Sequence, residues 1–173
     1  MADAEATLSE AFHQHLGRLL SRHDRLLDKV DETEAGELGR RAAEAALAPL
    51  IWGEAVGERW DTTATAEFLG VTRQALHDRV KRGTLLGVPG RGVTWFPIWQ
   101  FDLAGRCARP VVGSLLQVFR NMERPLDAVE IASWAQRPHA ELDDMAPADW
   151  IADGRSDDAV VTTARHSAAR LAA

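Results

Sequence analysis

Hydrophobic residues recur at intervals of three and four along the first part of the chain, which is the spacing of one helix face. This stripe predicts an amphipathic helix that ends near Val30, and its members are Leu8, Phe12, Leu16, Leu19, His23, Leu26 and Val30. Thr7 and Glu10 have the spacing of a capping box, so we expect Thr7 to cap the start of this helix. A single apolar stripe needs a partner, which is either a second copy of the chain or the next helix.

Residues 31–36 are acidic and turn-forming, and they predict a break after the first helix. A second helix with a face of small alanines is expected from Glu37 to Ala48. Pro49 should interrupt or restart it, because proline has no backbone N–H to donate. The apolar pattern then continues toward the centre of the chain through Leu50, Ile51, Trp52, Val56 and Trp60.

Residues 60–102 follow another pattern, with two short helices and a hairpin. Asp61 or Thr62 can cap a helix over 63–68, and Gly70 supplies the positive φ angle of a tight turn. Thr72 can cap a second helix over 73–82, which Gly83 ends. Short β-prone runs over 85–88 and 93–96 flank the turn residues 89–92, and they predict a β-hairpin. This order is typical of a winged helix-turn-helix, which places its second helix in a DNA major groove.

The remainder reads as helical after an irregular linker over 103–110. We expect helices over 111–119, from Pro125 through Trp134, and from about Ser156, with a loop over 138–154 that holds a short helix begun by Pro147. The fold class is therefore mainly α with one β-hairpin. The expected division is an N-terminal helical pair (1–58, able to dimerise), a winged helix-turn-helix (59–102), the linker (103–110) and a small helical C-terminal domain (111–173).

Charge separates the same regions. The net charge of the 173 residues is −6. Residues 1–58 hold six Lys and Arg against twelve Asp and Glu, residues 59–122 hold nine against four, and residues 123–173 hold five against ten. An acidic chain as a whole is not typical of nucleic-acid binding, but its middle third carries the local positive charge that binding to DNA requires.

Composition excludes several classes. The acidic start MADAEATLSE has no apolar core of a secretory signal, and no stretch approaches the length of about 18 apolar residues that a membrane helix needs. The single cysteine, Cys107, forms no internal disulfide and no zinc site by itself, so a cytoplasmic protein is expected. The chain contains no phosphate-binding glycine loop, nucleophile elbow or metalloprotease motif. We therefore expect no enzyme, no cofactor and no metal.

The residues expected to contact DNA lie in the second helix of the middle region and at the hairpin tip. Arg73 and Gln74 stand at the helix start, where arginine can pair with guanine and glutamine with adenine. The full expected set is Thr72, Arg73, Gln74, His77, Arg79, Lys81, Arg82 and Arg91, the last four to hold phosphates or enter the minor groove. The alternative is a small helix pair whose basic face is only solvated.

The stretch Thr65–Ala75, AEFLGVTRQ at its centre, together with the following hairpin resembles winged modules of the MerR or excisionase kind. The region from about Val111 to Ala169 resembles the toxin-binding domain of the MbcA/ParS/Xre antitoxin group. The residues that carry this second likeness are Trp134, Pro138, Leu142, Pro147, Trp150, Gly154 and Val160.

The second resemblance implies that these seven residues serve toxin binding. It also implies a type II antitoxin that neutralises a co-encoded, NAD-consuming RES-type toxin and, as a homodimer, represses its own operon by binding the operator. Trp134 and Trp150 have an alternative as ordinary core residues. Two further functions stay open: a transcriptional regulator without a toxin, and a helical scaffold that never meets DNA.

Overall fold

A computed structural model describes residues 2–23, 25, 27–28 and 30–172 of the chain, so Leu26 of the expected apolar stripe lies outside the described residues. The helices are α1 (Ala2–Arg22), α2 (Glu32–Val56), α3 (Thr62–Leu69), α4 (Arg73–Arg82), α5 (Val111–Arg120), α6 (Ala128–Ala135), α7 (Pro147–Ala152) and α8 (Asp157–Ala172), with short 3₁₀ turns η1 (Ile98–Gln100) and η2 (Ala140–Leu142). The strands are β1 (Arg59–Asp61), β2 (Val88–Pro89), β3 (Thr94–Pro97), β4 (Phe101–Asp102) and β5 (Cys107–Ala108). The fold is mainly α with a small antiparallel sheet, as the sequence predicts.

The chain forms two compact units, Met1–Ala48 and Pro49–Ala173, which divide within α2. The division falls earlier than the boundary expected at residue 58. Both the expected winged module and the expected C-terminal domain lie in the second unit.

The helices of the first unit begin and end at other residues than expected. Thr7 does not cap α1, because the helix begins at Ala2 and the Thr7 hydroxyl donates to the Asp3 carbonyl at 2.7 Å. The helix also ends at Arg22, well before Val30. The next helix begins at Glu32 instead of Glu37, because the side chain of Asp31 accepts the backbone N–H of Glu34 at 2.8 Å.

Pro49 does not interrupt α2, which runs through it to Val56. Proline removes one backbone donor from a helix, and the carbonyl four residues earlier loses its partner. Here that carbonyl belongs to Ala45, whose surroundings are exposed, so water can replace the lost bond. The helix end at Val56 is fully buried and anchors α2 in the second unit.

The sheet of the second unit has the strand order β1-β3-β2 and is antiparallel. The hairpin of β2 and β3 was expected, and its register pairs Val88 with Trp95. Strand β1 was not expected; it pairs Trp60 with Phe96 on the other side of β3. A second ribbon pairs Phe101 of β4 with Ala108 of β5, so the prediction of an irregular linker over 103–110 is wrong in its last residues.

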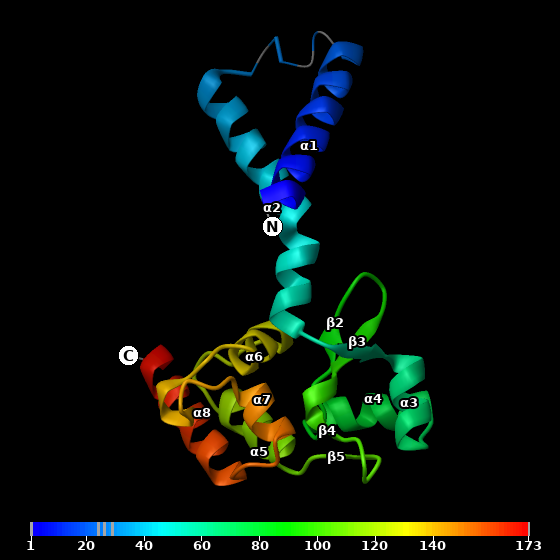
Figure 1. The fold of residues 1–173 in the computed structure, drawn as a ribbon, viewed down its shortest axis with the longest axis vertical. Coiled ribbons are helices and arrows are strands. Elements are labelled where there is room, and N and C mark those ends of the chain that lie inside the picture. The colour runs from blue at the N-terminus through cyan, green and yellow to red at the C-terminus, as the bar shows by residue number, and fades with distance from the viewer. Residues whose placement is uncertain (1, 24, 26, 29, 173) are drawn as a thin grey trace. The chain divides into compact units, whose positions relative to one another are not determined.

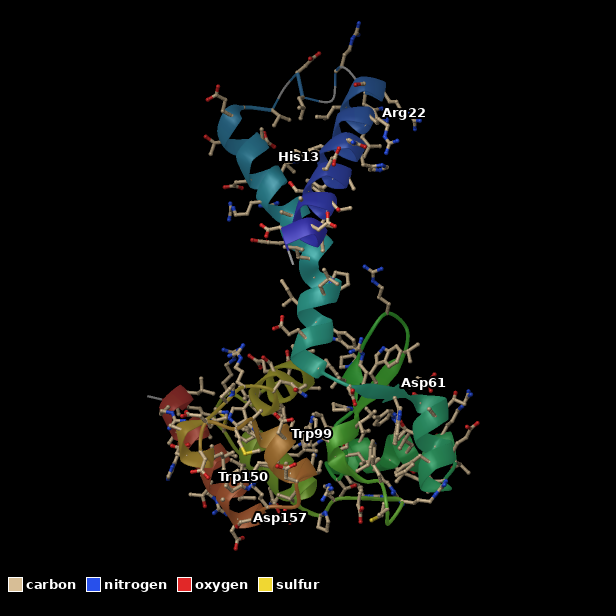
Figure 2. All side chains as sticks on the ribbon, viewed as in Figure 1. His13, Arg22, Asp61, Trp99, Trp150 and Asp157 are labelled. Atoms are coloured by element: carbon tan, nitrogen blue, oxygen red, sulfur yellow. The ribbon has the colours of Figure 1, made fainter. Side chains whose placement is uncertain are left out.

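Two clusters of buried side chains lie in this unit. The smaller lies beneath the helix-turn-helix and consists of Ala66, Leu76, Leu85, Phe96 and Phe101. The larger joins Leu86, Val88 and Trp99 of the winged part to the interior of α5–α8. In Figure 1 the helices α5–α8 gather on one side of this unit, and Figure 2 shows Trp99 between them and the winged part.

Gln100 of η1 holds the segment between α4 and β2 through two buried hydrogen bonds to Leu86. Its side-chain oxygen accepts from the Leu86 N–H at 2.8 Å, and its nitrogen donates to the Leu86 carbonyl at 3.0 Å. Gln100 itself is fully buried. The pair of bonds satisfies backbone groups that no strand partner reaches, and burial makes such groups costly to leave unpaired.

The C-terminal helices largely follow the sequence. Helices α5, α7 and α8 begin at or within one residue of the expected positions, and Asp157 and Asp158 occupy the first turn of α8. Helix α6 begins at Ala128 instead of Pro125. The reason is a capping box, in which Asp127 accepts the Glu130 N–H while the Glu130 side chain accepts the Asp127 N–H.

Candidate nucleic-acid interface

Helix α4 has the limits that the sequence predicts, and local caps set both of them. The Thr72 hydroxyl oxygen accepts the Ala75 N–H at 3.1 Å, with Thr72 itself in an extended conformation. Gly83 ends the helix with φ +76° and donates its N–H to the Arg79 and Val80 carbonyls. One face of α4 enters the core through Leu76, which is fully buried. The opposite face is therefore fixed toward solvent.

Local hydrogen bonds set the turn between α3 and α4. Gly70 adopts φ +63° and closes α3 through bonds to the Ala66 and Glu67 carbonyls. Asp61 caps the start of α3 by accepting the Ala64 N–H at 2.8 Å. The predicted cap, the turn glycine and the second cap are all confirmed. Because the two helices are capped and share one core, α4 is presented as a rigid element.

Most of the expected DNA-contacting side chains on α4 are exposed. Thr72, Arg73, Gln74, His77, Lys81 and Arg82 are exposed, whereas Arg79 is half-buried. Gln74, His77 and Lys81 are spaced by three and four residues and share one helix face. The structure thus brings the expected reading residues to the start of α4 and the expected phosphate-holding residues to its last turn.

Asp78 also belongs to this face, and the sequence reasoning missed it. Its carboxylate accepts a hydrogen bond from the Gln74 side-chain nitrogen at 3.1 Å. A glutamine amide nitrogen carries two hydrogens, so one remains free beside the carbonyl oxygen. Asp78 therefore fixes the orientation of the Gln74 amide without removing its capacity to pair with an adenine edge. The spacing of four residues between Gln74 and Asp78 is the sequence signal for this contact.

Arg73 leans toward α3, where its guanidinium donates to the Thr63 hydroxyl at 3.0 Å. A guanidinium has five N–H donors, so most of them remain available after this bond. The contact holds the Arg73 side chain near the N-terminal end of α4, which is the end that meets base edges in helix-turn-helix proteins.

Arg91 lies exposed at the tip of the wing, as expected. The Gly90 N–H donates to the Val93 carbonyl at 2.8 Å, and Gly92 takes φ +75°. Trp95 covers Gly90 so closely that an added Cβ would lie 2.5 Å from the indole nitrogen. The wing turn is therefore constrained at its base, with Arg91 free at its end.

Arg59 forms a cation–π cluster with Trp52 and Trp95 at the base of the wing, which the sequence analysis did not predict. The guanidinium carbon of Arg59 lies 4.8 Å from the Trp52 ring centroid and 5.4 Å from that of Trp95. The same group donates to the Gly57 carbonyl at 2.8 Å. The two aromatic rings attract the cation through their electron-rich faces. This arrangement ties the end of α2 to β3, which carries the wing.

The turn between β4 and β5 adds a further cation. Arg106 adopts φ +50°, and its guanidinium donates to the Glu67 carbonyl at 3.2 Å while lying 5.5 Å from the Phe68 ring. Asp102 accepts the Ala104 N–H at 3.1 Å and shapes the same turn. Arg106 was overlooked because a linker was expected at this position.

The seven residues expected to bind a toxin do not form one surface. Trp134, Leu142, Pro147 and Val160 are buried, Trp150 is half-buried, and only Pro138 and Gly154 are exposed. Trp134 packs edge-on against Phe119 at a centroid distance of 5.0 Å, and its indole N–H donates to Ser167 at 3.0 Å. The buried members therefore support the helical core.

An apolar groove lies beside these helices. It has a volume of about 580 Å³ and is lined by Ile51, Ala55, Leu126, Val129, Glu130, Ser133, Trp134, Arg137, Ser167, Arg170 and Leu171. Ile51 and Leu171 are 60% and 63% exposed, and both line this one groove, so the groove is a patch and not a set of single exposed side chains. Arg170 also donates to Glu141 at 3.0 Å, and this hydrogen bond lowers the pKa of Glu141.

Comparison of the chain with known protein families, curated proteins and solved structures finds no match. None of the helices, over the residues described, combines the length and apolar character that a membrane crossing requires. Within 2–23, 25, 27–28 and 30–172, no three His, Cys, Asp or Glu side chains gather as a metal ion would need.

Proposed function

We propose that the chain binds double-stranded DNA in a sequence-dependent manner, with α4 in the major groove and the β2–β3 wing at the adjacent minor groove. The observation that carries this proposal is the capped, core-anchored α4, which exposes Arg73, Gln74 and His77 at its reading end. Lys81 and Arg82 follow in the last turn, where they can hold phosphates. The proposal implies a cytoplasmic protein, in the compartment that holds the DNA.

Each reading residue has a role that its chemistry supports. Gln74, held by Asp78, can pair with adenine, and Arg73 can pair with guanine. The Thr72 hydroxyl already accepts the Ala75 N–H, and its own hydrogen remains available for a phosphate oxygen. Arg91 at the wing tip can enter a narrow minor groove.

Duplexes selected from a random pool, followed by titration at several salt concentrations, test the proposal. Binding should favour one sequence and weaken as salt rises, because phosphate contacts release counterions. A scaffold that never meets DNA would select no duplex. Selected binding without any salt dependence would also contradict the proposed phosphate contacts.

We further propose that the chain is a homodimer joined through its first unit. Between Asp3 and Ala48 no side chain whose exposure is described is buried, although α1 carries an apolar stripe and α2 an alanine-rich face. Leu8, Leu16 and Leu19 of α1 are 47%, 39% and 41% exposed. Isolated helices without a packed face are marginal in water, so these faces require a partner surface. A second copy supplies a matching one.

Leu16→Glu with Leu19→Glu should convert the dimer to a monomer, because two buried carboxylates would oppose pairing of the stripes. Light scattering coupled to size exclusion measures the mass directly. Arg18→Glu, on the same helix but outside the stripe, is the matched control and should leave the dimer intact. A wild-type chain that is monomeric at high concentration would contradict the proposal.

A second function, neutralisation of a RES-type toxin as a type II antitoxin, is proposed for the C-terminal helices. The apolar groove with exposed Ile51 and Leu171 favours it, because partner proteins commonly cover such patches. A regulator without a toxin is the alternative, and the winged module would be the same in both.

Ile51→Glu with Leu171→Glu should abolish co-purification of a toxin encoded beside this chain, and it should leave DNA binding intact. The loss follows from placing charge in an apolar contact. The matched control is Leu103→Glu, because Leu103 is 56% exposed but lies outside the groove. If the complex still formed with both groove substitutions, the toxin contact would lie elsewhere on the chain.

A further inference from the structure

A polar cleft lies between the end of α4 and the outer face of α5, beyond the helix that the proposed function assigns to the major groove. Its volume is about 510 Å³, and its polar lining consists of Arg82, Thr84, Ser114, Gln117, Arg120 and Asn121. Among the residues that the structure describes, no acidic side chain lines the cleft. Arginine, hydroxyl and amide side chains are the donors that proteins use for phosphate oxygens.

Arg120 of α5 packs against Gly83 at the base of the cleft, so closely that a Cβ added to Gly83 would clash with the guanidinium. A Cβ added to Gly113 would make ordinary van der Waals contact with the Gly83 carbonyl oxygen, at 3.8 Å. Arg120 of α5 donates to the Val80 carbonyl at 3.1 Å. The carbonyl end of a helix carries partial negative charge, and the Arg120 guanidinium offsets it at this end of α4. An anion can therefore approach a helix end that would otherwise repel it.

The donors of the cleft continue the basic last turn of α4. Arg82 belongs to both, while Ser114 and Gln117 of α5 and Asn121, which caps its end, follow one another at spacings of three and four and are exposed. We propose that this cleft holds a backbone phosphodiester of the bound DNA duplex, next to the segment that α4 reads. The inference rests on the proposed DNA binding and extends its contact surface from the winged module to α5.

A polyanion fits the cleft better than a small free anion. All of its donor side chains are exposed, so a single phosphate would stay largely solvated and gain little. A duplex already held by α4 presents its phosphates at high effective concentration, which makes a weak site effective. Duplex DNA and free phosphate share one chemistry, and the experiment separates them.

Two opposite substitutions at one position test the proposal. Gln117→Glu should weaken duplex binding about threefold to fivefold, and Gln117→Lys should strengthen it by a similar factor, as expected of one partly solvated charge contact. The slope of log affinity against log salt should become shallower in Gln117→Glu and steeper in Gln117→Lys, by up to about 0.9 for one phosphate. Mere damage to the fold would weaken binding in both.

Gln14→Glu is the matched control, because Gln14 is an exposed glutamine on α1 and undergoes the same change of charge. It should bind DNA as the wild type does. If both Gln117 variants bound the duplex with the affinity of the wild type, this inference would be overturned and the proposed function would stand. A wild type that binds no duplex would overturn the proposed function and this inference with it. Shifts of the Asn121 side-chain amide signals with inorganic phosphate but not with duplex would show a free-anion site and also overturn it.

Discussion

Replacing Arg73 and Gln74 together by alanine should remove sequence preference in DNA binding while the fold stays intact. A good bidentate contact discriminates between bases by about 1–3 kcal/mol, so the double variant should lose at least about 30-fold in affinity for its preferred duplex. Lys81 and Arg82 remain, and weak binding to any duplex should therefore persist. Fluorescence anisotropy with the preferred and a scrambled duplex measures both affinities.

Arg165→Ala is the control for the loss of one exposed arginine, because Arg165 lies on the exposed face of α8. It should bind the preferred duplex as the wild type does. Circular dichroism should show the same helix content in all variants, since Arg73 and Gln74 are exposed and make only exposed side-chain bonds. A double variant that keeps its preference would place the reading residues outside the start of α4.

Trp134→Ala should destabilise the second unit by about 3–5 kcal/mol, the usual cost of removing a large buried aromatic side chain. Trp134 is only 8% exposed, lies against Phe119, and donates to Ser167. The substitution removes packing and leaves the buried Ser167 hydroxyl without this donor. Urea unfolding followed by circular dichroism measures the loss.

Trp150→Ala is the comparison, because Trp150 is half-buried and its indole N–H donates to the Ser156 carbonyl near the surface. It should lose much less stability than Trp134→Ala. Trp134 also lines the apolar groove, so if Trp134→Ala unfolded at the same urea concentration as the wild type yet lost a protein partner, its small exposed part would be a contact with that partner. The expected result is instead that any loss of partner follows from loss of the fold.

The parts of the fold that sequence reasoning predicted are those that short-range chemistry determines. Thr72 and Gly83 limit α4 through bonds to residues three or four positions away, and Gly70 sets the turn through its own φ angle. Such signals lie within one window of the sequence. The same reliance on local spacing gave a wrong helix start in the first unit. Thr7 and Glu10 have the spacing of a capping box, but the helix has already begun at Ala2.

The parts that were missed depend on contacts between distant segments. Strand β1 exists because Trp60 pairs with Phe96, and three residues give no periodicity to detect. The cation–π cluster of Arg59 requires Trp52 and Trp95 to lie close together in the fold, which their sequence positions do not imply. For Trp134 the sequence left a core role open beside a contact role, whereas the burial of Leu142 and Val160 was not predicted, because such residues in a short motif are compatible with either role.

In the larger buried cluster, Leu86, Val88 and Trp99 of the winged part pack against the interior of α5–α8. This shared core limits which fragments of the chain can fold by themselves. A fragment cut after Met122 would lack the helices that cover these side chains, and the wing strand would lose its support along with them. We therefore expect residues 49–173 to melt in a single cooperative transition. Point substitutions on intact chains, and not deletions, are the means by which DNA recognition and partner recognition can be separated.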